Sequence, residues 1–408
     1  MGKTWIMKEF GQSYYQNMAY INFDGNTRML QLFSGDFDIS RIIAGIEIES
    51  GIKINPNDTL IVFDEIQENP NALTSLKYFY EKAPQYNIIA AGSMLGVALH
   101  ENTSFPVGKV EFLNLFPLSF HEFLDACEEK KLLELIEKRD WPLVSTFRDR
   151  YINLLQSYYF IGGMPEALND FITHKDYFRV KKIQKNILIS YEQDFSKHVS
   201  TGMVTKVRMI WNSIIGQLSK ENKKFIYGAL KKGARAKEYE SALTWLEDCG
   251  LIYRVNRVNV PMMPLKAYED LESFKLFILD VGLLAAMGDI NPKILLESPD
   301  IFSQFKGALT EQYVLQQLKT FGNIPINYWT NNNATSEVDF VIQIDNEVAP
   351  LEVKSSLNLK SKSLKVYMDK FSPAIVVRSS IADYKQIENL YDIPLYAIEQ
   401  IKSINAKH

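Results

Sequence analysis

The pattern of apolar and polar positions predicts a strand and a helix within residues 59–80. Residues 60–63, within the stretch TLIVFDEIQENP, form a continuous apolar run. Such a run is typical of a strand that is buried on both faces of a parallel sheet. Asn69 can cap the helix that follows, and Pro70 suits the first turn of that helix. The next apolar stretch, YNIIAAGS, predicts a second buried strand after this helix.

These elements indicate an α/β fold at the N-terminus. A helix is expected from Trp5 to about Tyr15, and a strand from Ala19 in the stretch AYINFDG. The order strand, helix, strand with short connections is that of a βαβ unit. We therefore expect a parallel sheet with helices packed on it.

After the predicted sheet, the chain is mostly helical to about residue 220, and a hairpin is predicted near its end. Ser119 and Glu122 form a capping box before an apolar run. Helical spacing then continues to about residue 220, interrupted by a turn at Gly162-Gly163 in YFIGGMPEAL. The spacing over residues 205–265 resembles that of a winged helix-turn-helix. The segment EVDFVIQIDNEVAPLEVKSS predicts two strands that turn at Asp345-Asn346.

Composition and charge narrow the class of protein. The 408 residues carry a net charge of -4, which does not favour nucleic acid binding over the whole surface. Cys127 and Cys249 are the only cysteines, so a disulfide framework is not expected and a reducing compartment fits better. No apolar run approaches the roughly 20 residues that a membrane helix needs. We expect a cytoplasmic protein without a membrane partner.

The first group of candidate functional residues lies at the N-terminus and after the strand at residues 60–63. Gly2, Lys3 and Thr4 match the last three positions of the phosphate-binding loop G-x-x-x-x-G-K-[ST]. Asp64 and Glu65 follow a buried strand, where the first could hold Mg²⁺ and the second could polarise the attacking water. An acidic pair at a strand end can also begin a solvated loop.

One further polar residue belongs to this hypothesis. Ser93 ends the next strand, in AAGSM, where its hydroxyl could sense a γ-phosphate. A helix cap is an equally good explanation of this serine.

Seven stretches in a fixed order resemble one family. They are GKTWIMKEF, YINFD, LIVFDEIQ, IIAAGSMLG, LFPLSFHEFL, YYFIGGMPEAL and YWTNNNATSEVDFVIQ...LEVKSS. The chain closely resembles prokaryotic AAA-like ATPases that carry a C-terminal domain of unknown function, number 4143. The resemblance implies ATP and Mg²⁺ as cofactors, a P-loop NTPase sheet, a helical and winged-helix middle, and a C-terminal α/β module similar to restriction endonucleases.

The resemblance also sets expected domain limits. These are an ATPase core over residues 1–125, a helical region over 126–204, a winged-helix part over 205–270 and an endonuclease-like domain over 271–408. Members of the family begin with a strand and a glycine-containing lead into Gly-Lys-Thr, and this sequence lacks both. We therefore expect a parallel sheet without its first strand, from a reading frame truncated within the phosphate-binding loop.

A second group of candidate residues lies in the predicted hairpin. Glu352 and Lys354 are two apart on a strand and so share a face, and Asp339 can meet them from the partner strand. Glu311, on the preceding helix, could add a carboxylate. Carboxylates and a lysine in this arrangement can bind Mg²⁺ and activate water at a phosphodiester, as in PD-(D/E)xK nucleases. Alternating Glu and Lys on a strand is also common on a solvated face with cross-strand pairs.

A basic segment suggests a third kind of contact. Six basic residues without an acidic one could hold DNA phosphates, namely Lys223, Lys224, Lys231, Lys232, Arg235 and Lys237. The helix that follows is acidic, which fits packing on a protein partner equally well. Three hypotheses thus stay open: an ATP-hydrolysing switch, a DNA-binding or DNA-cleaving effector, and a binding scaffold with a degenerate nucleotide site.

Overall fold

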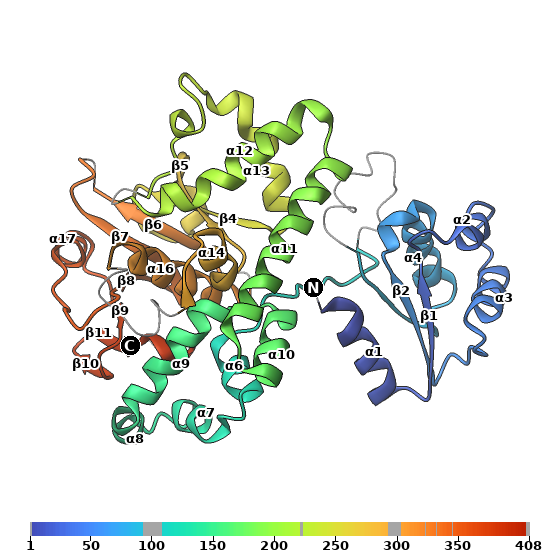
Figure 1. The fold of residues 1–408 in the computed structure, drawn as a ribbon, viewed down its shortest axis with the longest axis horizontal. Helices are drawn as coiled ribbons and strands as arrows, with labels where there is room; N and C mark the ends of the chain where they lie inside the picture. Colours follow the sequence, from blue (N-terminus) through green and yellow to red (C-terminus); the bar gives the residue numbers. More distant parts are fainter. Residues whose placement is uncertain are drawn as a thin grey trace. The chain divides into compact units, whose positions relative to one another are not determined.

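The computed structural model describes residues 2–92, 108–220, 223–292, 303–322, 324–331, 333–344 and 346–404. The chain forms two compact units (Figure 1). The first is Met1–Leu115 with Asp248–Gly250, and the second is Phe116–Glu247 with Leu251–His408. Within the described residues, no helix combines the length and the apolar character that crossing a bilayer requires. The expected division into four domains stays a prediction beside these two units.

The first unit contains a three-stranded parallel sheet in the order β1-β2-β3. Its strands are β1 (Asn17–Asn22), β2 (Thr59–Asp64) and β3 (Asn87–Ala90). Its helical elements are α1 (Lys3–Tyr14), α2 (Thr27–Phe33), α3 (Ile39–Ser50), the short 3₁₀ turn η1 (Ile66–Glu68) and α4 (Pro70–Lys82). Every residue of the central strand β2 is buried, as its continuous apolar run predicts.

Local signals in the sequence explain how the helices of this unit begin. The Asn69 side chain accepts a hydrogen bond from the backbone N–H of Ala72, which caps α4 with Pro70 in its first turn.

The core of this unit contains Phe23, Phe33 and Phe63, whose rings meet edge to face at centroid distances of 5.3–5.9 Å. This packing fixes β2, and therefore the residues at its carboxyl end.

The second unit begins with a helical layer. It consists of α6 (Phe120–Ala126), α7 (Lys130–Glu137), α8 (Trp141–Thr146), α9 (Arg148–Ile161), α10 (Pro165–His174), α11 (Tyr177–His198), α12 (Thr201–Leu218), η2 (Tyr227–Ala229) and α13 (Ala236–Asp248). The predicted capping box is present in α6, where Ser119 and Glu122 exchange hydrogen bonds with each other's backbone N–H. Two backbone N–H groups at the start of α6 are thereby satisfied.

A mixed eight-stranded sheet completes the second unit, in the order β10-β11-β9-β8-β7-β6-β4-β5 (Figure 1). Its strands are β4 (Ile252–Val258), β5 (Glu269–Ile278), β6 (Ile326–Thr330), β7 (Glu337–Ile344), β8 (Glu347–Val353), β9 (Val376–Ser380), β10 (Lys385–Ile387) and β11 (Leu390–Pro394). The accompanying helices and turns are η3 (Leu265–Tyr268), α14 (Val281–Met287), α16 (Ser303–Lys319), α17 (Lys362–Phe371) and η4 (Leu395–Ser403).

Two features of this sheet bear on the sequence predictions. Strands β7 and β8 pair antiparallel, as the predicted hairpin requires. Strands β4 and β5 also pair antiparallel, as the wing of a winged helix would, but β4 additionally pairs with β6 in the same sheet. The winged-helix assignment of residues 205–270 therefore stays a prediction. Its two strands, β4 and β5, belong to the same sheet as the C-terminal strands.

A buried polar network ties the entry segment of the second unit to its helices. Leu118 donates its backbone N–H to the carbonyl of Gly163 at 2.8 Å, and Tyr158 donates its hydroxyl to the carbonyl of Leu118. The backbone N–H of Gly163 donates to Asp280 Oδ2 at 2.7 Å, and Gln316 donates to the same oxygen at 3.1 Å. The Gly162-Gly163 turn is thus a point of close backbone approach.

Candidate functional site

The carboxyl end of β2 brings together the residues predicted to contact a nucleotide. Gly2 precedes α1 with a left-handed φ of 82°, a conformation that glycine adopts without strain. Lys3 and Thr4 begin α1, so their side chains lie beside β2 and β3. Lys3 Nζ donates to the carbonyl of Gly92 at 2.9 Å, and Thr4 Oγ1 donates to Asp64 Oδ2 at 2.6 Å. The first turn of α1 and the end of β2 therefore form one polar site.

Asp64 is the acceptor at the centre of this site. It is only 2% exposed, and its Oδ2 accepts hydrogen bonds from Thr4 and from the hydroxyl of Tyr20 at 2.8 Å. Its Oδ1 accepts from the backbone N–H of Glu65 at 3.1 Å. Burial and the hydrogen bond to Asp64 raise the pKa of Tyr20 to about 12. Tyr20 therefore stays a neutral donor to Asp64 throughout the physiological pH range.

Glu65 has an unusual backbone conformation. Its φ is 51° and its ψ is 44°, in the left-handed region that residues with a side chain adopt infrequently. Gln67, which is 5% exposed, donates its side-chain N–H to Glu65 Oε2 at 2.5 Å. Ile66 donates its backbone N–H to the carbonyl of Ala91, which fastens the turn to the neighbouring strand end. The turn after β2 thus fixes both the backbone and the carboxylate of Glu65.

Lys3 lies in the field of both carboxylates. Burial lowers the pKa of the Lys3 ammonium below its ordinary value, although Glu65 and Asp64 act in the opposite direction. An incoming anion would therefore meet a partly desolvated cation, at which electrostatic interactions are stronger than in water. This charge distribution suits phosphate groups.

Most of the residues that the sequence predicts for a nucleotide site lie together here. The predicted residues Gly2, Lys3, Thr4, Asp64 and Glu65 all lie at the start of α1 or the end of β2. Ser93 lies outside the described residues. Tyr20 and Gln67 were missed. Tyr20 lies two residues before the end of β1, and this position near a strand end is the feature of the sequence that could have indicated it. Gln67 has no comparable feature besides its place in the stretch DEIQ.

The residues present fit a Mg²⁺ ion. Mg²⁺ prefers oxygen ligands and is usually held by one or two protein groups together with substrate phosphates and water. The Thr4 hydroxyl and the Asp64 carboxylate supply such oxygens and are already in contact. Two protein ligands are enough for a site of this kind.

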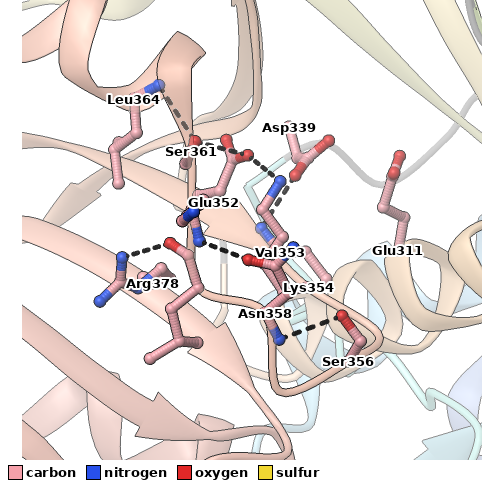
Figure 2. Close-up of polar contacts among 12 residues, drawn as sticks. Glu311, Asp339, Glu352, Val353, Lys354, Ser356, Asn358, Ser361, Leu364 and Arg378 are labelled. Atoms are coloured by element: carbon pink, nitrogen blue, oxygen red, sulfur yellow. Dashed lines mark hydrogen bonds and ion pairs between the residues drawn. The ribbon is translucent and has the colours of Figure 1, made fainter.

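The second predicted group lies on α16, β7 and the end of β8 (Figure 2). Lys354 Nζ lies 2.6 Å from Glu352 Oε1, which also accepts a hydrogen bond from the Ser361 hydroxyl at 2.9 Å. Asp339 Oδ2 accepts the backbone N–H of Val353 at 2.8 Å. The structure therefore brings Asp339, Glu352 and Lys354 together, and Figure 2 shows Glu311 approaching them from α16.

Glu311 already has cationic partners, however. Lys223 forms an ion pair with Glu311 Oε1, and Lys275 Nζ lies 3.7 Å from Glu311 Oε2. Among the residues that the structure describes, no group of three or more His, Cys, Asp or Glu side chains is arranged to hold a metal ion. Lysine side chains thus contact or lie close to both carboxylate oxygens of Glu311.

The expected basic patch is smaller in the structure than in the sequence. Lys223 forms an ion pair with Glu311, and Lys224 donates a hydrogen bond to Ser273 Oγ at 2.9 Å. We therefore do not count these two lysines in the exposed basic patch. The four remaining members are exposed, namely Lys231, Lys232, Arg235 and Lys237. The prediction of six basic side chains available for phosphates is wrong for Lys223, because a long-range ion pair holds it.

Family models match three segments of the chain. Residues 1–124 match an AAA domain, residues 152–294 match a domain of unknown function (DUF8612), and residues 306–398 match another (DUF4143). No match was found among curated proteins. Among solved structures, the Walker-type ATPase of Pyrococcus abyssi is similar over 70% of this chain and 88% of that chain, at 12% identity and a TM-score of 0.43. The chain thus has an AAA domain at its N-terminus and a domain of unknown function 4143 at its C-terminus, as the resemblance implies.

Proposed function

We propose that the N-terminal unit binds ATP with Mg²⁺ and hydrolyses it, and that the chain acts as a nucleotide-dependent switch. The observation that carries this proposal is the contact of 2.6 Å between Thr4 Oγ1 and Asp64 Oδ2. It joins the helix that begins at Lys3 to the carboxyl end of a buried parallel strand, where nucleotides bind in sheets of this type. The AAA domain match over residues 1–124 supports the same proposal.

Each residue has a role that follows from its place. The first backbone N–H groups of α1 have no partner within the helix and can face an anion, with Gly2 allowing close approach. Lys3 would contact the β- and γ-phosphates. Thr4 and Asp64 would hold Mg²⁺, which neutralises charge on the phosphates when it is bound.

Glu65 would orient and polarise the attacking water. A group with this role must hold one orientation, because proton transfer depends on the geometry of the donor and the acceptor. The hydrogen bond from Gln67 Nε2 to Glu65 Oε2 and the constrained turn provide that orientation. Gln67 is therefore proposed as a positioning residue for Glu65.

A titration with a fluorescent ATP analogue and Mg²⁺ tests the proposal. The 408-residue chain should bind the analogue, and Lys3→Ala should lose at least tenfold in affinity, because a charge-assisted phosphate contact is lost. Glu65→Gln should retain binding and lose turnover. Equal binding by the original chain and Lys3→Ala would refute the phosphate contact of Lys3, and binding by neither would refute the nucleotide site and leave the scaffold hypothesis.

We also propose a second candidate function, in which the second unit binds nucleic acid through its phosphates. The supporting observation is the exposure of Lys231, Lys232, Arg235 and Lys237 within seven residues before and at the start of α13. Such contacts weaken with salt, because bound counterions are released on association. Fluorescence anisotropy of a labelled DNA duplex should show salt-dependent binding that is lost in Lys231→Glu/Lys232→Glu, and unchanged binding by this variant would exclude the site.

A further inference from the structure

The carboxylate cluster of the second unit contains its own cations. Glu311 is 5% exposed and Glu352 is 4% exposed, so neither is well hydrated. A buried carboxylate requires an opposite charge nearby, because burial removes the stabilisation that water gives to an ion. The identity of that opposite charge decides what this cluster can bind.

Lys275 is the first internal cation. It lies on β5 with no exposed surface, and its Nζ lies 2.5 Å from Glu337 Oε1 and 3.7 Å from Glu311 Oε2. Burial acts to lower the pKa of Lys275, but the charges of Glu337 and Glu311 outweigh burial and raise it. Lys275 therefore remains protonated while it is sealed inside the protein.

Lys223 is the second internal cation. It belongs to the segment between α12 and η2, and its ammonium group contacts the other oxygen of Glu311. Both oxygens of Glu311 thus face ammonium groups. A divalent ion at the same oxygens would lie within a few ångströms of two positive charges, which is strongly unfavourable at low dielectric.

The third observation concerns the charge balance. Burial, together with the nearby charges of Glu311 and Glu352, raises the pKa of Asp339 well above its ordinary value. The three other carboxylates of the cluster then face three lysines: Glu311, Glu337 and Glu352 against Lys223, Lys275 and Lys354. Lysines thus supply the positive charge that these three carboxylates require.

We propose that Lys223 and Lys275 occupy the cation positions of this carboxylate cluster, so that it excludes a divalent metal, and that Lys223 is the cation whose removal opens it. The two lysines lie within residues 152–294, and Glu311 and Asp339 lie within residues 306–398. One family segment therefore neutralises the carboxylates of the other. A cluster filled in this way differs from the site of a metal-dependent nuclease. The proposal does not rest on ATP hydrolysis by the N-terminal unit.

Binding of Mn²⁺ to the full chain without nucleotide tests the exclusion. Asp64→Asn should be present throughout, so that the N-terminal site does not contribute. We expect no binding to the Asp64→Asn chain up to roughly millimolar Mn²⁺, the range of weak oxygen-ligand sites for divalent ions. Adding Lys223→Met should create one Mn²⁺ site, which Asp339→Asn should remove again. Lys232→Met, at an exposed lysine, is the matched control and should not bind.

Two outcomes would overturn the proposal. Mn²⁺ binding that is lost on Asp339→Asn while Lys223 is intact would show that the lysines do not fill the cluster. A folded Lys223→Met chain that binds no Mn²⁺ would show that Lys223 is not the excluding cation.

A double-mutant cycle on stability covers the case in which Lys223→Met folds poorly. Lys223→Met and Glu311→Gln should each lower the folding equilibrium constant by about a hundredfold or more, since each leaves a buried partner unpaired. The double variant should lose much less than the product of the two effects. Simple multiplication of the two effects would exclude the pairing.

Discussion

Replacing Gly163 by alanine should destabilise the second unit through one steric clash. A Cβ at Gly163 would lie 2.6 Å from the backbone nitrogen of Leu118, and nearer still to its carbonyl oxygen. Unlike Gly162, whose φ is 71°, Gly163 has no left-handed φ, so backbone strain does not confuse the result. The change therefore tests the close approach of two backbone segments.

The size of the effect follows from the contacts that hold Leu118. A carbon atom and a backbone polar atom ordinarily lie no closer than about 3.3 Å. The Leu118 backbone would therefore have to move away from the new Cβ by about 0.7 Å or more. That shift strains the hydrogen bond from Leu118 to Gly163 and the one from Tyr158 to Leu118, each worth about 1 kcal/mol. Overpacking adds about 1–3 kcal/mol. We expect a total loss of about 3–5 kcal/mol.

Denaturant unfolding of Gly163→Ala, followed by circular dichroism, measures this loss. Gly216→Ala is the matched control, because a Cβ at this exposed position in α12 meets nothing within 4 Å. The control should be neutral or more stable by about 0.5–1 kcal/mol. ATP analogue binding should be unchanged in both variants, since Gly163 belongs to the second unit. A loss below about 1 kcal/mol in Gly163→Ala would refute the steric argument.

Three further predictions concern single side chains. Tyr20→Phe removes one of two side-chain donors to Asp64 Oδ2, and it should raise the Mg²⁺ concentration needed for half-maximal ATPase activity by roughly tenfold, about 1–2 kcal/mol; an unchanged Mg²⁺ titration would contradict this. Gln67→Leu should lower kcat by roughly tenfold or more with an unchanged Kd for ATP, and a parallel loss of binding would indicate a merely structural role. Burial raises the pKa of Asp280 to about 6, so its contribution to stability is complete below about pH 4 and is lost, by up to ~3 kcal/mol, as the pH rises through 6. Denaturant midpoints at pH 4.5 and 7.5 should therefore differ more in the original chain than in Asp280→Asn, and equal differences would exclude this role.

The sequence predicted the elements of the fold whose signals are local. The apolar run of β2, the Asn69 cap of α4 and the capping box of Ser119 and Glu122 all depend on residues within a few positions of one another. The same holds for the hairpin of β7 and β8. Helices α2 and α3 were not predicted, although Asn26 and Asp38 cap them through side-chain hydrogen bonds to Met29 and Arg41.

The candidate nucleotide site was predictable for a related reason. Lys3 and Thr4 form part of a local motif, and Asp64 and Glu65 follow a strand whose burial is visible in the sequence. Parallel strands place their carboxyl ends at one edge of the sheet, so motif and strand end meet there. Tyr20 and Gln67 required the structure, because their roles depend on the direction of one side chain and the shape of one turn.

The sequence by itself therefore determined the buried strand β2, the caps of α4 and α6, and the residues of the candidate nucleotide site. Only the tertiary structure decided the character of the second cluster, since Lys223 and Glu311 are 88 residues apart and Lys275 reaches the same carboxylate from another strand. Local patterns follow from neighbours along the chain, which every sequence displays. A buried charge takes its partner from whichever element packs against it, and that choice is made by the packing of the whole unit.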